Sequence, residues 1–268
     1  MPASESDLKL AVEAAERAGK IALGFFRKNP RWHDKADHTP VSEADMAVDA
    51  ALKELLLSAR PDDGWLSEET ADDLSRLEKS RVWVLDPVDG TRGFLQGDPN
   101  WCVSLALVVD GRPVIGVINA PALGRTWRAA KGRGAYLDGA PARVSGREEL
   151  TGAHVIGPRY IHDPARWGRP WPKVSITRLP SLALRLARVA SGDADAMAAP
   201  GYKREWDVAA GDIIVREAGG VVTDAGGERC VYNSEDTRIF GVAAAGEKLH
   251  AQIMERMRTY RGAKRRKE

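Results

Sequence analysis

The stretch Val82-Trp-Val-Leu-Asp86-Pro-Val-Asp89-Gly-Thr91 constrains this chain more than any other part of its sequence. Its first four residues are an apolar run typical of a buried strand. Two carboxylates, Asp86 and Asp89, follow the run on either side of a proline. The next residues, Gly90 and Thr91, are typical of a tight loop or helix start with free backbone N–H groups. Carboxylates bind hard cations and free N–H groups bind phosphate oxygens, so this loop predicts a site for both.

Length, net charge and cysteine content limit the classes of protein to which this chain can belong. The 268 residues are 43% hydrophobic, enough for a sizeable core in one large domain or two lobes. A net charge of +2 gives no reason to expect a nucleic-acid partner. The two cysteines, Cys102 and Cys230, lack metal-ligand spacing, the N-terminus is too polar for a signal peptide, and no apolar run approaches the roughly 18 residues of a membrane span. These features predict a cytoplasmic protein without a membrane segment.

Hydrophobic periodicity divides the chain into two lobes of one domain, residues 1–268. In residues 1–148, an amphipathic helix over 7–28, ended by Pro30, precedes a second helix that Ser42 and Asp45 begin in capping-box fashion. Strands follow, including a hairpin with an Asp-Gly turn at 110–111. Residues 149–260 alternate short strands and helices, which is an α/β pattern. A basic tail, 261–268, is most simply a solvated terminus. The predicted fold class is α/β, with an α+β first lobe.

Acidic residues in four separate segments carry the chemistry. Each follows a short strand or opens a helix: Asp45, Glu68, Asp86, Asp89 and Asp207. Carboxylates crowded in one cleft repel each other and have raised pKa values unless cations neutralise them. Magnesium is the ordinary solution, because it takes oxygen ligands and keeps water and substrate phosphate in its shell.

Four motifs in the same order resemble those of the inositol monophosphatase superfamily. Asp86-Pro-Val-Asp89-Gly-Thr91 is similar to its DPxDGT signature, and Glu205-Trp-Asp207-Val-Ala-Ala-Gly211 through Gly220 is similar to its second signature. Leu66-Ser-Glu68-Glu69 and Thr39-Pro-Val-Ser-Glu-Ala-Asp45 match its two other short motifs. The resemblance covers about residues 8–255, nearly the whole chain.

The resemblance implies a layered αβαβα sandwich, as in fructose-1,6-bisphosphatase, and a Mg²⁺-dependent phosphomonoesterase that lithium typically inhibits. It assigns a first metal ion to Glu68, Asp86 and the Val88 carbonyl, and a second to Asp86, Asp89 and Asp207. Glu68, with Asp45 nearby, would help to hold a weaker third. Thr91, with Glu68, would orient the attacking water, and the N–H groups of Gly90 and Thr91 would hold phosphate oxygens. Members of the family are often dimers, so a homodimer is an open possibility.

Substrate choice rests on a few variable positions. A basic residue after the Thr of the first signature, such as Arg92 here, is common in the nucleotidases and in the histidinol phosphatases of the family, and the nucleotidases carry a Lys where this chain has Arg185. The Glu with which inositol enzymes bind sugar hydroxyls is replaced by Pro200. Together with Lys203 and Arg204, these cations would meet a second phosphate. The favoured substrate is 3′-phosphoadenosine 5′-phosphate, cleaved by a 3′(2′),5′-bisphosphate nucleotidase. Inositol monophosphatase is the runner-up and histidinol phosphatase, which shares Trp101 in a Gly-x-Pro-x-Trp pattern, is third.

Other interpretations of these residues stay open. Arg185 and Arg204 are also typical of ordinary surface cations on helix faces. Lys35 is a weaker candidate for the site. A regulatory homologue that has lost activity is the rival to an enzyme, but the complete acidic set argues against it.

Overall fold

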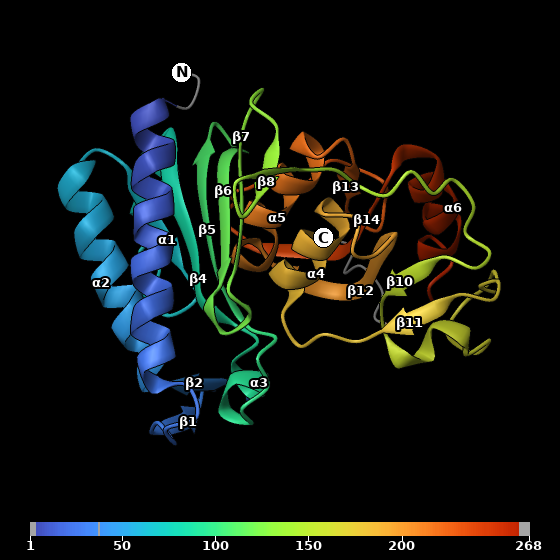
Figure 1. The fold of residues 1–268 in the computed structure, drawn as a ribbon, viewed down its shortest axis with the longest axis horizontal. Coiled ribbons are helices and arrows are strands. Elements are labelled where there is room, and N and C mark those ends of the chain that lie inside the picture. The colour runs from blue at the N-terminus through green and yellow to red at the C-terminus, as the bar shows by residue number, and fades with distance from the viewer. Residues whose placement is uncertain (1–3, 37, 263–268) are drawn as a thin grey trace.

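The structure is a computed structural model that describes residues 4–36 and 38–262. It is a sandwich of five layers in the order helices, sheet, helices, sheet, helix (Figure 1). The helices are α1 (Glu5–Phe25), α2 (Glu43–Ala59), α3 (Thr91–Leu95), α4 (Leu182–Ala190), α5 (Glu205–Glu217) and α6 (Glu247–Met257). The mixed α/β class and the αβαβα layering that the sequence predicted are both confirmed.

The outer layer of α1 and α2 packs on one face of the first sheet through an apolar core rich in alanine and leucine. Both helices begin with a capping box, at Ser4 and at Ser42, in which the cap hydroxyl and a carboxylate satisfy the first N–H groups. The expected span 7–28 for the first helix is wrong at both ends. The Ser4 cap starts the helix two residues earlier, and left-handed Arg27 and Asn29 turn the chain away before Pro30.

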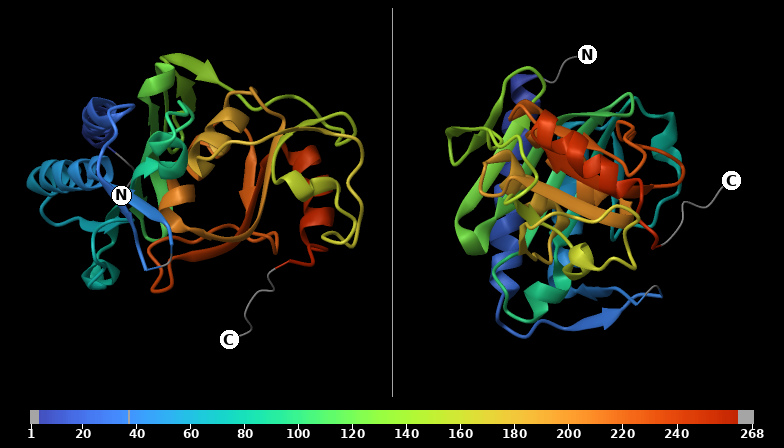
Figure 2. Two further views of the ribbon diagram at one scale, coloured as in Figure 1. Left: turned by 90° about the horizontal axis from the view of Figure 1, so that it is seen from below. Right: turned by 90° about the vertical axis from the view of Figure 1, so that its right-hand side faces the viewer.

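The first sheet has seven strands in sequence order: β3 (Gly64–Ser67), β4 (Arg81–Asp89), β5 (Cys102–Val109), β6 (Arg112–Ala120), β7 (Arg125–Ala130), β8 (Ala135–Leu137) and β9 (Ala140–Ala142). Only β3 and β4 are parallel, and the remaining neighbours are antiparallel. The predicted Asp-Gly turn joins β5 and β6, with positive φ at both Asp110 and Gly111. A separate ribbon of β1 (Trp32–Asp34) and β2 (Pro40–Ser42) lies beside α3 at one end of the molecule (Figure 2).

A β-bulge separates the two carboxylates of the opening motif. Asp86 pairs with Ser104 and Asp89 pairs with Cys102, so a step of three residues along β4 matches a step of two along β5. In a regular strand, residues three apart point to opposite faces of the sheet. Because the bulge absorbs one residue, Asp86 and Asp89 share one face. Ser104 on that face donates a hydrogen bond to the Trp206 carbonyl in α5, so both carboxylates face the central helices.

The central layer of α4 and α5 lies between the two sheets and packs on both. Two glycines allow this close approach. A Cβ on Gly116 of β6 would lie 2.5 Å from the Ala210 carbonyl oxygen of α5, and a Cβ on Gly211 of α5 would lie 2.5 Å from Leu186 of α4. The bare backbone at these positions therefore sets how deeply α5 sits against its neighbours.

The second sheet has the order β11 (Ser175–Thr177), β10 (His154–Ile156), β12 (Ala196–Arg204), β14 (Arg238–Ala245) and β13 (Val221–Thr223). Strands β11, β10 and β12 run parallel to one another, and β14 runs antiparallel to both of its neighbours, β12 and β13. Helix α6 covers the outer face of this sheet. Because α4 and α5 pack on both sheets, the predicted boundary near residue 148 stays a prediction. Most of the basic tail, residues 263–268, lies outside the described residues. None of the described helices combines the length and apolar character that a membrane crossing requires.

Candidate metal and phosphate site

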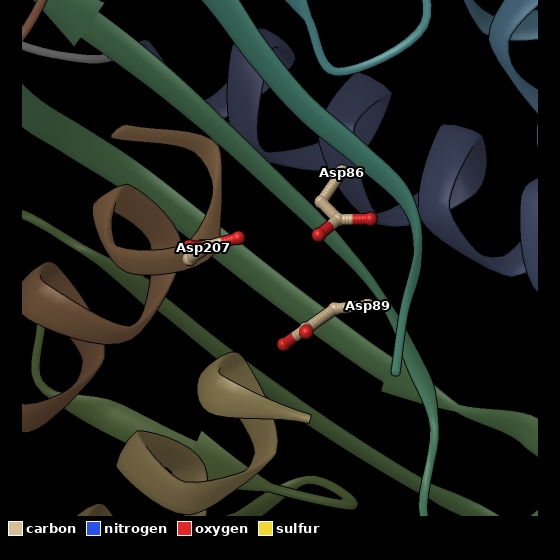
Figure 3. A group of neighbouring side chains, drawn as sticks. All are labelled: Asp86, Asp89 and Asp207. Atoms are coloured by element: carbon tan, nitrogen blue, oxygen red, sulfur yellow. The ribbon is translucent and has the colours of Figure 1, made fainter. Parts of the chain in front are cut away.

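Three carboxylates from two elements converge at the end of β4. Asp86 and Asp89 come from the bulged end of the strand, and Asp207 comes from the first turn of α5 (Figure 3). One oxygen of each lies within 4.8 Å of the others, in the geometry of a cation site. Asp86 and Asp89 are buried and Asp207 is half-buried. The structure therefore brings together three residues that the sequence placed in separate motifs.

Electrostatics at this cluster favours a bound cation. Burial raises the pKa of Asp86 well above its ordinary value, and repulsion from Glu68, Asp89 and Asp207 raises it further. Burial likewise raises the pKa of Asp89 to about 6 and that of Asp207 to about 7. Among the described residues, only the Val88 N–H, 3.1 Å away, donates a hydrogen bond to Asp86. Hard cations take carboxylate oxygens of this kind, so the donor set fits a divalent ion such as magnesium.

Backbone and hydroxyl donors fix two of the three carboxylates. The Ser181 hydroxyl and the Ala183 N–H, at the start of α4, donate to the same oxygen of Asp89 over 2.7 and 2.6 Å. The Arg204 N–H donates to one oxygen of Asp207 over 2.9 Å. Ser181 was not predicted from the sequence, although a serine directly before an apolar helical segment is a recognisable cap signal. It caps α4 through the Leu184 N–H as well.

Thr91 and Asp45 lie together beside the cluster. The Thr91 hydroxyl is 2.9 Å from the Val88 carbonyl oxygen and 3.3 Å from an oxygen of Asp45. Asp45 is almost fully buried, and its other oxygen accepts from Ser42 in the capping box of α2. Burial raises the pKa of Asp45 to about 6. Gly90, with φ of +99°, turns the chain from β4 into α3, and a Cβ there would lie a tight 3.3 Å from Ser181.

Glu68 follows β3 and is held by a lysine. Lys35 Nζ lies 2.8 Å from both Glu68 Oε1 and Glu69 Oε1. Glu68 is not among the three carboxylates within 4.8 Å of one another, yet its charge raises the pKa values of Asp45, Asp86 and Asp207. Although burial opposes it, the two glutamates raise the pKa of Lys35 above its ordinary value. Lys35, which the sequence indicated only weakly as a site residue, therefore places a positive charge between Glu68 and Glu69.

None of the three carboxylates lines the cavity of about 760 Å³, but two residues of its lining, Arg185 and Lys203, interact electrostatically with Asp207, so the cavity adjoins the cluster. Its lining includes two predicted substrate residues, Arg92 and Arg185, together with Lys203. It also includes Arg159, in the short 3-10 helix Arg159–His162, and Arg178, directly after β11; neither was predicted, because these short segments show no periodicity. The side chain of Arg204 does not line this cavity, and it instead reaches the Thr237 hydroxyl, so its role in substrate binding stays a prediction.

Comparisons with known proteins agree with this geometry. The model of the inositol monophosphatase family matches residues 4–261. A histidinol-phosphatase of Mycobacterium tuberculosis is 39% identical over 95% of this chain and 98% of its own, and inositol monophosphatase 2 of Solanum lycopersicum is 36% identical over 83% and 89%. The IMPase of Thermotoga maritima, a solved structure, has 28% identity and a TM-score of 0.82 over 94% of this chain and 97% of that one. With its layered fold and its acidic cluster at the end of β4, the chain belongs to the inositol monophosphatase family, whose members are metal-dependent phosphatases.

Proposed function

We propose that this phosphatase uses magnesium to hydrolyse a small phosphate ester that carries a second anionic group, with 3′-phosphoadenosine 5′-phosphate as the first candidate. The single observation that carries the proposal is the charge of the cavity beside the carboxylate cluster. Its lining holds five basic side chains and one acidic side chain, Asp98. The basic residues are Arg92, Arg159, Arg178, Arg185 and Lys203.

The cations in this cavity are poorly neutralised by the protein itself. The guanidinium groups of Arg159 and Arg178 have no ion pair or hydrogen bond among the described residues, and the charge of Arg178 repels that of Arg185. Lys203 donates only to backbone carbonyls, and Arg185 donates to the carbonyls of Leu179 and Pro180. Burial lowers the pKa of both Arg185 and Lys203. A substrate phosphate entering the cavity would supply the missing negative charge.

The residues of the cluster have distinct roles in the proposed reaction. Glu68, Asp86, Asp89, Asp207 and the Val88 carbonyl would hold two or three magnesium ions. Bound magnesium would lower the pKa of the attacking water, neutralise the phosphoryl oxygens and stabilise the departing alkoxide. The N–H groups of Gly90 and Thr91 would position the phosphate. Thr91 would donate a hydrogen bond to Asp45 and accept one from the attacking water. As the water attacks phosphorus, its proton would pass to the Thr91 hydroxyl while the Thr91 proton passes to the Asp45 carboxylate.

A second candidate, histidinol phosphate, is favoured by a different observation. Asp98 Oδ1 accepts hydrogen bonds from Asn100, whereas Oδ2 has no donor among the described residues. A substrate ammonium group could take that position at the cavity wall. Two similar proteins are named histidinol-phosphatases. Against this candidate, five cations in the same lining would repel an ammonium group.

The test compares substrates that differ by one group. Phosphate release at saturating magnesium is measured for 3′-phosphoadenosine 5′-phosphate, adenosine 3′-phosphate, histidinol phosphate and inositol 1-phosphate. We expect the bisphosphate to have the highest kcat/KM and to exceed adenosine 3′-phosphate, which lacks only the second phosphate. Histidinol phosphate ahead of both nucleotides would establish the second candidate instead.

Variants then locate the second anion. Arg178→Gln should raise KM for the bisphosphate by about tenfold, since a charged hydrogen bond contributes about 1.5–3 kcal/mol, and leave KM for adenosine 3′-phosphate unchanged. Arg17→Gln, on the exposed face of α1, removes the same charge far from the cavity and serves as the control. An equal rise in KM for both nucleotides would contradict a second-phosphate role for Arg178.

A further inference from the structure

A buried arginine outside the site joins segments that lie far apart in sequence. Arg76, in the short 3-10 helix Ser75–Glu78 between β3 and β4, is 1% exposed. Its guanidinium donates to both oxygens of Asp72, to the Asn233 side chain over 2.7 Å and to the Ser234 carbonyl over 2.9 Å. The Asn233 amide returns a hydrogen bond to the Arg76 carbonyl over 3.1 Å. The Arg76 side chain, from the connection between β3 and β4 of the first sheet, therefore holds the loop between β13 and β14 of the second sheet in place.

The same loop holds the start of α5. The N–H groups of Asn233 and Ser234 donate to the two oxygens of Glu205 over 2.6 and 2.9 Å. Glu205 is 1% exposed and is the first residue of α5, and its own N–H donates to the Thr237 carbonyl of that loop. Asn233 has φ of +58°, so the loop takes a left-handed turn to present these groups. We name the five residues Asp72, Arg76, Asn233, Ser234 and Glu205 the Arg76 clamp.

The clamp ends two residues before Asp207. The body of α5 is fixed by packing on β5 and β6, where Gly116 permits close approach. Its first turn is held from the sheet side by Ser104, which donates to the Trp206 carbonyl, and from the other side by Glu205 of the clamp. Asp207 lies in that turn, and Asp86 lies in the sheet. Side chains that orient a carboxylate in this way tune metal affinity without touching the metal.

We propose that the Arg76 clamp is a positioning device that sets Asp207 against Asp86 and Asp89 and thereby determines the affinity of the cluster for a divalent cation. The inference rests on the proposed function, because it takes Asp207 as a metal ligand. Arg76 itself touches none of the three carboxylates. Its effect passes through the loop to Glu205 and from Glu205 to the first turn of α5.

The experiment measures Mn²⁺ binding to the metal-free full-length protein by titration calorimetry, beside the thermal midpoint of each variant. Arg76→Met removes all five hydrogen bonds that the guanidinium donates, at similar side-chain length, and Glu205→Gln replaces one acceptor oxygen. We expect each to raise the Mn²⁺ Kd by about tenfold. Because both act through the same loop, the double variant should weaken binding no more than the stronger single variant does. Glu205→Gln retains the size of the side chain and keeps the test decisive if Arg76→Met fails to fold.

Arg81→Met is the matched control. Arg81 also makes ion pairs with two buried carboxylates, Asp7 and Asp63, although its own side chain is partly exposed, and it lies at the start of β4, far along the strand from Asp86. If the clamp positions Asp207, Arg81→Met should keep the Mn²⁺ Kd within about twofold of that of the parent protein, even though it lowers the thermal midpoint about as much as Arg76→Met does. Equal weakening by Arg76→Met and Arg81→Met, or an unchanged Kd in the clamp variants, would overturn the proposal.

Asp207→Asn separates this proposal from the one on which it rests. If Asp207→Asn loses Mn²⁺ affinity while the clamp variants keep it, the clamp inference fails and the ligand assignment stands. If Asp207→Asn binds Mn²⁺ like the parent protein, Asp207 is no ligand and the proposed function loses that residue.

Discussion

At the scale of single residues, the site is a set of carboxylates whose charge the described protein does not neutralise. Asp86, Asp89 and Asp207 have raised pKa values because burial and mutual repulsion act in the same direction. Such an arrangement costs stability until a cation enters. The unfavourable charge is therefore evidence of a ligand, and each carboxylate can be tested by neutralising it.

The first prediction concerns Asp89. Asp89→Asn removes a charge from the cluster at constant shape, so phosphate release should fall by about two orders of magnitude or more while the metal-free protein keeps its thermal midpoint. The measurement is magnesium-dependent phosphate release beside thermal unfolding in chelator. Asp62→Asn, at an exposed position, is the control. Near-normal turnover by Asp89→Asn would be incompatible with its role as a ligand.

The second prediction concerns Ser181, which donates to Asp89 and caps α4. Ser181→Ala should lower the free energy of unfolding by about 0.5–2 kcal/mol through the lost cap, and raise the Mn²⁺ Kd by about tenfold through the released carboxylate. Ser191→Ala, at the other end of α4, removes a hydroxyl that contacts only the carbonyls of Ala187 and Arg188. It should leave Mn²⁺ binding unchanged. Equal Mn²⁺ affinity in both variants would show that Ser181 serves the helix alone.

At the scale of elements, α5 has to lie close to the sheet for Asp207 to reach Asp86. Gly116 of β6 permits that closeness, since a Cβ there would lie 2.5 Å from the Ala210 carbonyl oxygen of α5. Gly211 permits close packing of α5 on α4, since its Cβ would lie 2.5 Å from Leu186. Along the chain, β12 leads directly into α5. The position of one metal-ligand candidate thus depends on backbone packing several residues away.

The third prediction tests this packing with two glycines in helices. Gly211→Ala places its Cβ against Leu186 and should cost about 1–3 kcal/mol of unfolding free energy through overpacking. Gly24→Ala, on the open face of α1, meets nothing within 4 Å and should gain about 0.5–1 kcal/mol through helix propensity. Chemical denaturation measures both. The opposite sign at either position would contradict the packing described.

The sequence predicted the helices, the strands and the motif residues better than it predicted the contacts between segments that lie far apart in the chain. Asp86, Asp89 and Asp207 were identifiable from local patterns, and so were the capping box at Ser42 and the Asp-Gly turns. The bulge between the two aspartates was not, because it exists only in the pairing of β4 with β5. Arg159 and Arg178 were not predicted as site residues either. They follow β10 and β11, whose parallel pairing brings both to one edge of the second sheet, and no local pattern reveals that pairing.

At the scale of the whole molecule, the charge of the cluster couples folding to pH and to metal. Asp207 and Glu205 have pKa values of about 7 in the folded protein, above their ordinary values, because burial disfavours their charged forms. A folded state that binds more protons than the unfolded state loses stability as pH rises. Below about pH 6.5 His250 opposes this trend, since burial lowers its pKa to about 4. The window from pH 6.5 to pH 8 is therefore the informative one.

The fourth prediction follows from that window. In chelator, the thermal midpoint should fall between pH 6.5 and pH 8, with Asp207 alone contributing about 1 kcal/mol. Asp207→Asn should flatten the fall. Magnesium binds the ionised carboxylates, so saturating magnesium should raise the midpoint more at pH 8 than at pH 6.5. A midpoint of the metal-free protein that rises across this window would contradict the raised pKa values.

The bulge between Asp86 and Asp89 has a consequence for how this chain can vary. Side chains alternate between the two faces of a strand, so residues three apart ordinarily face opposite sides. The bulge places Asp86 and Asp89 on the same face in spite of this separation. A substitution at either intervening residue changes a side chain and leaves the number of residues unchanged. A deletion of one residue there leaves the aspartates two apart, so both carboxylates stay on the α5 face only if the bulge disappears together with that residue. Any change in residue number therefore has to be matched by a change in the pairing of β4 with β5, whereas a substitution leaves that pairing intact.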